Sequence, residues 1–254
     1  MSELKALLFD VDGTLADTEK DGHRVAFNLA FKQAGLDWDW DAALYGELLA
    51  VTGGKERIKF YLDKFNTRFT KPADLDGFVK GLHASKTEFY TQLLAEGKIP
   101  LRSGVARLIN EARQAGLRLA IATTTTPENV TALLTHTLGA DSLNWFEVIA
   151  AGDSVPAKKP APDIFTWALA KMKLQPNEAI AFEDSRNGIL SSKAAGLKTI
   201  ITVNGYTAKD DFSQAELVLD QMGDPLNVFR VIKGEVGHRT YLDLSLVKQV
   251  FYAG

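Results

Sequence analysis

Near its start the chain reads Lys5-Ala-Leu-Leu-Phe-Asp10 and continues as Val11-Asp12-Gly13-Thr14-Leu15. A short apolar run without alternation is typical of a strand that is buried on both faces, as the strands of parallel sheets are. The aspartates and the glycine that follow predict a loop at the carboxyl end of that strand. The segment therefore favours an α/β protein whose acidic side chains lie at the sheet edge where ligands bind.

The chain from about Pro100 onward alternates between predicted helices and strands. Helices are expected over 105–115, 127–134, 162–172 and 187–195, and strands over 117–122, 148–151, 179–182, 198–203 and 217–219. This alternation predicts a parallel sheet with helices on both faces, which the first strand joins. Beyond Pro225, the stretch Tyr241-Leu-Asp-Leu-Ser-Leu alternates with the period of a strand, so we expect an edge strand there.

Residues 18–94 have a different pattern. Apolar residues recur at helical spacing, as Val25 with Leu29 and Phe27 with Phe31 do, and no strand is apparent. Further helices are expected over 39–49, 55–64 and 74–95. We therefore expect a helical cap domain at 18–94, inserted after the first strand of a core domain made of 1–17 and 95–254.

The composition excludes several classes of protein. The chain has 254 residues and no cysteine, which excludes disulfides, thiolate zinc sites and thiol nucleophiles. Lys plus Arg is 29 and Asp plus Glu is 32, a net charge of −3 that argues against nucleic-acid or membrane partners. With no transmembrane or signal segment apparent, we expect a cytoplasmic protein (or one in an organelle stroma). We expect it to bind a small-molecule substrate and to be a monomer.

The predicted strand ends carry a particular set of side chains. They are Asp10 and Asp12 after the first strand, Thr123 after the second, Lys159 beyond the third, and Glu183 with Asp184 after the fourth. Two carboxylates about 4 Å apart repel by about 4 kcal/mol at an effective dielectric near 20, so this cluster requires cations. Lys159 supplies one positive charge, and Mg²⁺ suits the oxygen ligands of the carboxylates. No His or Cys is among these strand-end residues, which argues against zinc.

Such a set can carry out phosphoryl transfer. One carboxylate can attack phosphorus, and a second can protonate the leaving oxygen and later activate water. A lysine, a hydroxyl and the helix start near Pro127 can hold the phosphate oxygens. For the hydroxyl, Thr123 is preferred over its neighbours up to Thr126, and for the amine, Lys159 is preferred over Lys158.

Four motifs together resemble those of the haloacid dehalogenase superfamily, in the subgroup with a helical C1 cap. They are Phe9-Asp10-Val11-Asp12-Gly13-Thr14-Leu15, Thr123 after a strand, Lys159-Pro-Ala-Pro-Asp-Ile-Phe, and Glu183-Asp184-Ser185-Arg186-Asn187-Gly188-Ile189. The resemblance implies a Rossmann-like core, an Mg²⁺ cofactor, and a phosphatase: the superfamily's dehalogenases lack the acid that Asp12 provides.

The same resemblance implies a role for each motif residue. Asp10 resembles the nucleophile, which is also a metal ligand, and Asp12 resembles the general acid and base, with its backbone carbonyl on the metal. Thr123 and Lys159 resemble the phosphate-binding pair. Asp184 resembles the remaining protein ligand of Mg²⁺, and Glu183 a ligand either directly or through water.

A closer resemblance is to the xylulose 1,5-bisphosphate phosphatases of Calvin-cycle organisms. It rests on Asp17-Thr18-Glu19, on the segment Thr52–Arg57, on Leu82–Thr87 and on Ala122–Asn129. Substrate-binding candidates are Asp12, Glu19, Thr52, Gly53, Gly54, Lys55, Arg57, Lys86, Arg102 and Thr124, with His23 and His83 as further contacts. The glycines offer exposed N–H groups and the basic residues offer charge, so we hypothesise that the cap binds the distal phosphate.

Two alternatives remain at this level. A sugar phosphomutase of the β-phosphoglucomutase type shares every core motif and differs in how long its phospho-enzyme resists water. A phospho-receiver signalling domain also combines acids, a threonine and a lysine on a parallel sheet. It would be about half this length and would lack the helical cap, so the cap at 18–94 argues against it.

Overall fold

The protein core is a parallel sheet, as predicted. The computed structural model describes residues 3–253, and within them one seven-stranded sheet has the order β3-β2-β1-β4-β5-β6-β7. The strands are β1 (Ala6–Phe9), β2 (Arg118–Ala122), β3 (Val148–Ala150), β4 (Ala179–Glu183), β5 (Lys198–Thr202), β6 (Leu217–Leu219) and β7 (Val231–Lys233). Neighbours pair in parallel except β7, which is antiparallel to β6. β1 lies between β2 and β4, which places its carboxyl end between the carboxyl ends of those two strands.

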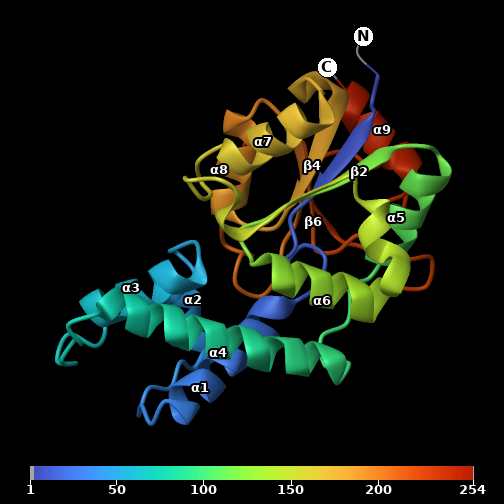
Figure 1. Cartoon of the computed structure of the whole chain (residues 1–254). Coiled ribbons are helices and arrows are strands. Elements are labelled where there is room, and N and C mark those ends of the chain that lie inside the picture. The colour runs from blue at the N-terminus through green and yellow to red at the C-terminus, as the bar shows by residue number, and fades with distance from the viewer. Residues whose placement is uncertain (1–2, 254) are drawn as a thin grey trace.

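Helices cover both faces of this sheet (Figure 1). They are α5 (Val105–Gln114), α6 (Pro127–Leu138), α7 (Asp163–Met172), α8 (Arg186–Ala194) and α9 (Leu244–Tyr252). On one face Leu7 and Phe9 of β1 belong to the apolar core shared with α5, α6 and α9. On the other face Ala6 and Leu8 pack in a core with α7. Alternate residues of a fully buried strand thus serve opposite cores, which explains the continuous apolar run.

The segment between β1 and α5 is helical, as the sequence predicts. After a short π-helical turn at Glu19–His23 come α1 (Arg24–Gln33), α2 (Ala42–Leu48), α3 (Gly54–Lys64) and α4 (Leu75–Ala95). Their shared core is rich in aromatic side chains, including Phe27, Phe31, Trp38 and Trp40. This helical block lies below the carboxyl edge of the sheet in Figure 1. Residues of this block and of the strand ends together line the cavities described below.

The predicted edge strand at 241–246 is wrong. Asp243 accepts a hydrogen bond from the Leu246 N–H (2.7 Å) and begins α9, whose buried residues Leu246, Val247 and Val250 follow helical spacing. The alternation before it is too short to distinguish a strand from a helix start. The edge strand is instead β7, whose three residues are exposed.

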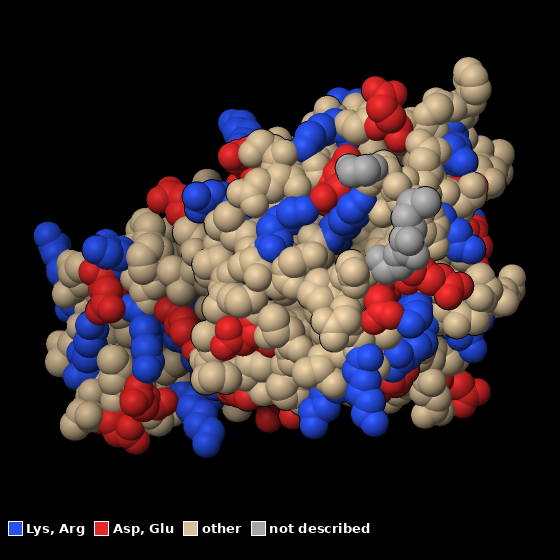
Figure 2. Space-filling model, turned by 90° about the horizontal axis from the view of Figure 1, so that it is seen from above, with Lys and Arg blue, Asp and Glu red and all other residues tan. Residues whose placement is uncertain are grey.

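The charged side chains are mixed on the surface (Figure 2), in keeping with a net charge near zero. On the face shown in Figure 2, basic and acidic side chains are interspersed rather than gathered by sign. In the described part of the chain, no helix has the length and apolar character needed to cross a membrane.

Candidate active site

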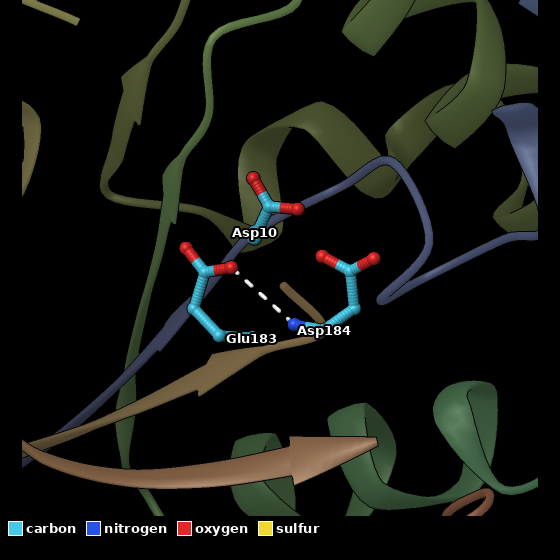
Figure 3. Close-up of side chains that lie close together, drawn as sticks. All are labelled: Asp10, Glu183 and Asp184. Atoms are coloured by element: carbon cyan, nitrogen blue, oxygen red, sulfur yellow. Dashed lines mark hydrogen bonds between the residues drawn. The ribbon is translucent and has the colours of Figure 1, made fainter. Parts of the chain in front are cut away.

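Three carboxylates meet at the carboxyl edge of the sheet (Figure 3). Asp10 directly follows β1, Glu183 ends the adjacent β4, and Asp184 comes next. One oxygen of each lies within 4.8 Å of the other two, and all three residues are buried. The Asp184 N–H donates to Glu183 Oε2 at 3.3 Å, the dashed line in Figure 3. Parallel pairing of β1 with β4 is what brings these acids together.

This cluster has too little positive charge around it. Lys159 Nζ donates to Asp10 Oδ1 (2.6 Å) and Glu183 Oε1 (2.5 Å), and Asn204 Nδ2 donates to Asp184 Oδ2 (2.7 Å). Burial raises the pKa of Glu183 to about 8 despite Lys159, and burial also raises the pKa of Asp10 and Asp184. Buried carboxylate oxygens that resist ionisation without a further cation fit a hard divalent metal ion.

Two glycines make room for the carboxylates. A Cβ atom on Gly13, whose φ is +81°, would lie 2.2 Å from Asp184 Oδ2. A Cβ atom on Gly188 would lie 1.8 Å from Glu183 Oε2. Both distances are far shorter than any van der Waals contact, so a side chain at either position would displace a carboxylate. The motif glycines are therefore needed for the geometry of the cluster.

Asp12 is directed away from that cluster, toward the cap. Its Oδ1 accepts from the Thr18 hydroxyl (2.6 Å) and from His23 Nε2 (2.8 Å), while Lys86 Nζ donates to His23 Nδ1 (2.7 Å). Burial acting alone would raise the pKa of Asp12, but His23 and Thr18 hold it below its ordinary value. Burial lowers the pKa of Lys86 to about 8. Asp12 is thus a carboxylate held against Thr18 and His23.

Two joined cavities lie between sheet edge and cap. The inner cavity, of about 300 Å³, is lined by Asp10, Asp12, Glu19, Thr52, Arg57, Thr123, Thr124, Lys159, Glu183 and Asp184 among others. The outer cavity, of about 450 Å³, is lined by Gly53, Gly54, Lys55, His83, Lys86, Asp153 and Lys158 among others, and shares Asp12, Glu19, Arg57 and Thr124 with the inner one. A molecule that reaches from the carboxylates past Asp12 would enter the outer cavity.

A hydrogen-bonded trio includes Glu19 and Arg57, two residues that line both cavities. The Tyr45 hydroxyl donates to Glu19 Oε2 (2.5 Å) and accepts from Arg57 Nη1 (2.7 Å). Arg57 is buried, and its Nε has no partner among the described residues. An unpaired buried donor is costly unless a ligand uses it. Arg57 is therefore placed to bind an anionic or hydroxylated substrate.

The phosphate-binding candidate Thr123 lines the inner cavity, and the start of α6 lines the outer one. Thr123 is buried at the end of β2, where its N–H donates to Ala150 O (2.9 Å). Thr126 caps α6 by accepting from the Asn129 N–H (3.4 Å), and Pro127 occupies the first turn. The positive end of α6 thus borders the outer cavity.

Arg102 is the one substrate-binding candidate that the structure does not bring to either cavity. Its guanidinium donates to the carbonyl oxygens of Gly13, Val203 (2.6 Å) and Asp220 (2.8 Å). Its N–H donates to Leu15 O (2.8 Å). Arg102 therefore stabilises the segments that connect cap and core, because its N–H groups donate to backbone carbonyls of those segments.

Among the cavity-lining residues that were not sequence-derived site residues are Asp153, Lys158 and Asn204. Tyr45, whose hydroxyl contacts Glu19 and Arg57, was not among them either. Asn204 follows β5 at the same sheet edge, so the strand-end rule that selected Asp10 could have found it. Lys158 was considered only as a substitute for Lys159. Tyr45 and Asp153 have no such signal, because their roles depend on packing between cap and core.

Comparison with known proteins adds to this geometry. A family model described as haloacid dehalogenase-like hydrolase matches residues 4–196. The plasmid-encoded CbbY of Cupriavidus necator is 47% identical over 222 residues, covering 87% of each chain. CbbY from Rhodobacter sphaeroides, solved with phosphate, is 48% identical with a TM-score of 0.79, covering 86% of this chain and 94% of that one. An Asp-to-Asn variant of that protein, solved with xylulose 1,5-bisphosphate, matches equally well.

Proposed function

The chain belongs to the haloacid dehalogenase-like hydrolases and is a phosphatase, and on that basis we propose that it removes one phosphate from xylulose 1,5-bisphosphate through a phosphorylated Asp10. The observation that carries the proposal is the pair of joined cavities. The inner one holds the carboxylates, Lys159 and Thr123, and the outer one holds further cationic groups. A CbbY relative with nearly half its residues in common binds this sugar bisphosphate.

The outer cavity suits a second phosphate. Gly53, Gly54 and Lys55 begin α3 on the cap side, and Thr126 and Pro127 begin α6 on the core side. Helix N-termini offer free N–H groups and a positive dipole end to anions, and lysine adds full charge. A substrate with phosphates at both ends would satisfy both cavities, whereas a monophosphate would leave the outer one without an anion.

The chain's own residues account for the chemistry. Asp10 attacks phosphorus, and the bond from phosphorus to the sugar oxygen breaks as that oxygen takes a proton from Asp12. Asp12 then removes a proton from water, which attacks the aspartyl-phosphate and restores Asp10. A phosphate dianion bound beside Asp12 raises the pKa of Asp12, which favours its protonated form before the first step. Lys159 and Thr123 hold the non-bridging oxygens.

The donor set also fits a magnesium ion. Asp10, Asp184 and the backbone carbonyl of Asp12 would hold it, with Glu183 bound directly or through water. When bound, Mg²⁺ supplies positive charge that offsets the phosphate oxygens and the buried carboxylates. Lys159 alone does not balance Asp10, Glu183 and Asp184, and this imbalance supports the assignment.

Removal of the metal is expected to abolish turnover. Dialysis against EDTA should reduce phosphate release to background, because the repulsion between carboxylates and phosphate is then unscreened. Adding Mg²⁺ should restore activity, whereas Zn²⁺ should not, since the cluster has no nitrogen or sulfur ligand. Full turnover by protein shown to be metal-free by elemental analysis would contradict the assignment.

A substrate panel tests the proposed function. Free phosphate and remaining sugar phosphate are measured with xylulose 1,5-bisphosphate, ribulose 1,5-bisphosphate, and the xylulose 1- and 5-monophosphates. We expect the highest kcat/KM for xylulose 1,5-bisphosphate and one phosphate released per molecule. Isomerised sugar phosphate without free phosphate would instead identify a mutase, and a higher kcat/KM for a monophosphate would refute the bisphosphate as substrate.

A further inference from the structure

Two lysines of the outer cavity, Lys55 and Lys158, are already paired with carboxylates. Asp153, on the short 3-10 turn Gly152–Ser154 after β3, accepts from Lys55 Nζ of the cap at 2.8 Å. The second carboxylate oxygen of Asp153 lies 3.3 Å from Lys158 Nζ of the core. Asp153 thus bridges one lysine from each side of the cavity. All three residues line the cavity that would take the second phosphate.

A second carboxylate completes this arrangement. Glu56 of α3 accepts from Lys158 Nζ through both oxygens, each at 3.2 Å. Gly53 makes room for the pair: a Cβ atom there would lie 2.9 Å from Lys158 Nζ and 2.2 Å from Glu56 Oε2. Gly53 therefore leaves the space that this ion-pair network occupies at the start of α3.

We propose that Asp153 is a displaceable counter-ion that exchanges with the distal phosphate of the substrate and returns to the lysines when product leaves. This inference rests on the proposed function and assigns to Asp153 an effect on how long the product stays bound. The product keeps the distal phosphate, so the groups that bind substrate in the outer cavity also retain product. A carboxylate that competes for Lys55 and Lys158 shortens that retention.

The exposures of the residues favour exchange over a permanent bridge. The Asp153 side chain is 68% exposed and that of Lys55 is 36% exposed, so their pair is weak and breaks readily. The hydrogen bond from Lys55 lowers the pKa of Asp153, which is therefore a carboxylate at neutral pH. A phosphate dianion carries more charge and more acceptor oxygens than a carboxylate, and so displaces it. A substrate without a distal phosphate leaves Asp153 in place.

The test is Asp153→Asn, which keeps the shape of the side chain and removes its charge. The KM for xylulose 1,5-bisphosphate and the inhibition constant of the monophosphate product should both fall, by up to about fivefold for one exposed ion pair. Inhibition by inorganic phosphate at the carboxylate cluster should not change, and neither should the KM for the xylulose monophosphate that lacks the distal group. Wild-type kcat/KM on the same substrates tests the proposed function separately from the variant's ratios.

Two further variants make the outcome decisive. Glu128→Gln removes a carboxylate from the same cavity that forms no ion pair within the described residues, so it should leave both constants at wild-type values. In a Lys55→Met background, Asp153→Asn should have a smaller effect, because the lysine it releases is gone. Equal gains in the Glu128 variant would overturn the proposal in favour of general charge. A KM raised equally for all substrates would overturn it in favour of a latch that holds the cap closed.

Discussion

Replacing Asp10 with asparagine is expected to lower kcat at least about 10⁴-fold, because the amide cannot act as the nucleophile. Asparagine nearly preserves the shape of the side chain, and its oxygen can still accept from Lys159 Nζ, which lies 2.6 Å from Oδ1. The loss should therefore appear in turnover and not in folding. The measurement is phosphate release from xylulose 1,5-bisphosphate by protein purified away from any wild-type enzyme.

A matched control separates this effect from a change in net charge. Asp141→Asn alters an exposed aspartate on the 3-10 segment Ala140–Trp145 and should keep wild-type kcat. The Asp10 variant should also unfold at a temperature at or above that of the wild type, since it removes a buried charge from a crowded acidic cluster. Substantial turnover by a fully folded Asp10 variant would exclude the covalent mechanism.

The second large effect is expected for Asp12→Asn, which removes the proton donor and acceptor. For sugar phosphates kcat should fall by about 10²–10⁴-fold, the usual contribution of general acid–base catalysis. The loss in the first step should be much smaller with p-nitrophenyl phosphate, whose leaving group needs no proton. Hydrolysis of the phosphorylated Asp10 should still be slow, because no base activates water.

The Asp12 variant therefore has a distinctive kinetic signature. With p-nitrophenyl phosphate it should release a burst of nitrophenol equal to the enzyme concentration, followed by slow turnover. Mass spectrometry of the quenched reaction should detect the phosphorylated chain. An equal loss on both substrates without a burst would show that Asp12 acts by positioning and not by proton transfer.

The core of the site could be predicted from the sequence because its information is local. The candidate acids lie at or just beyond the ends of short apolar runs, and such runs become parallel strands whose carboxyl ends lie side by side. Asp10 and Glu183 are far apart in the chain, yet the register that pairs Phe9 with Phe182 makes them neighbours. The strand prediction for 241–246 was wrong for the same reason of locality, because a few alternating residues fit a strand and the start of a helix equally well.

The cap was harder to predict, although its helices were expected. Helical periodicity shows which side chains share a face of one helix, and it does not show what that face meets. Arg102 was expected at the substrate, but its guanidinium is used by the carbonyls of Gly13, Val203 and Asp220. Tyr45 resembled any aromatic core residue, yet its hydroxyl orients Glu19 and Arg57.

By itself, then, the sequence of this protein determined the parallel sheet, the helical block after β1, and the acids, threonine and lysine at the strand ends. Only the packing of that block over the sheet edge settled which cap residues reach the cavities, and it alone set Asp153 between Lys55 and Lys158. The physical reason is the range of the interactions. Strand ends are aligned by repeating backbone hydrogen bonds, whereas cavity walls depend on single contacts between elements far apart in the chain.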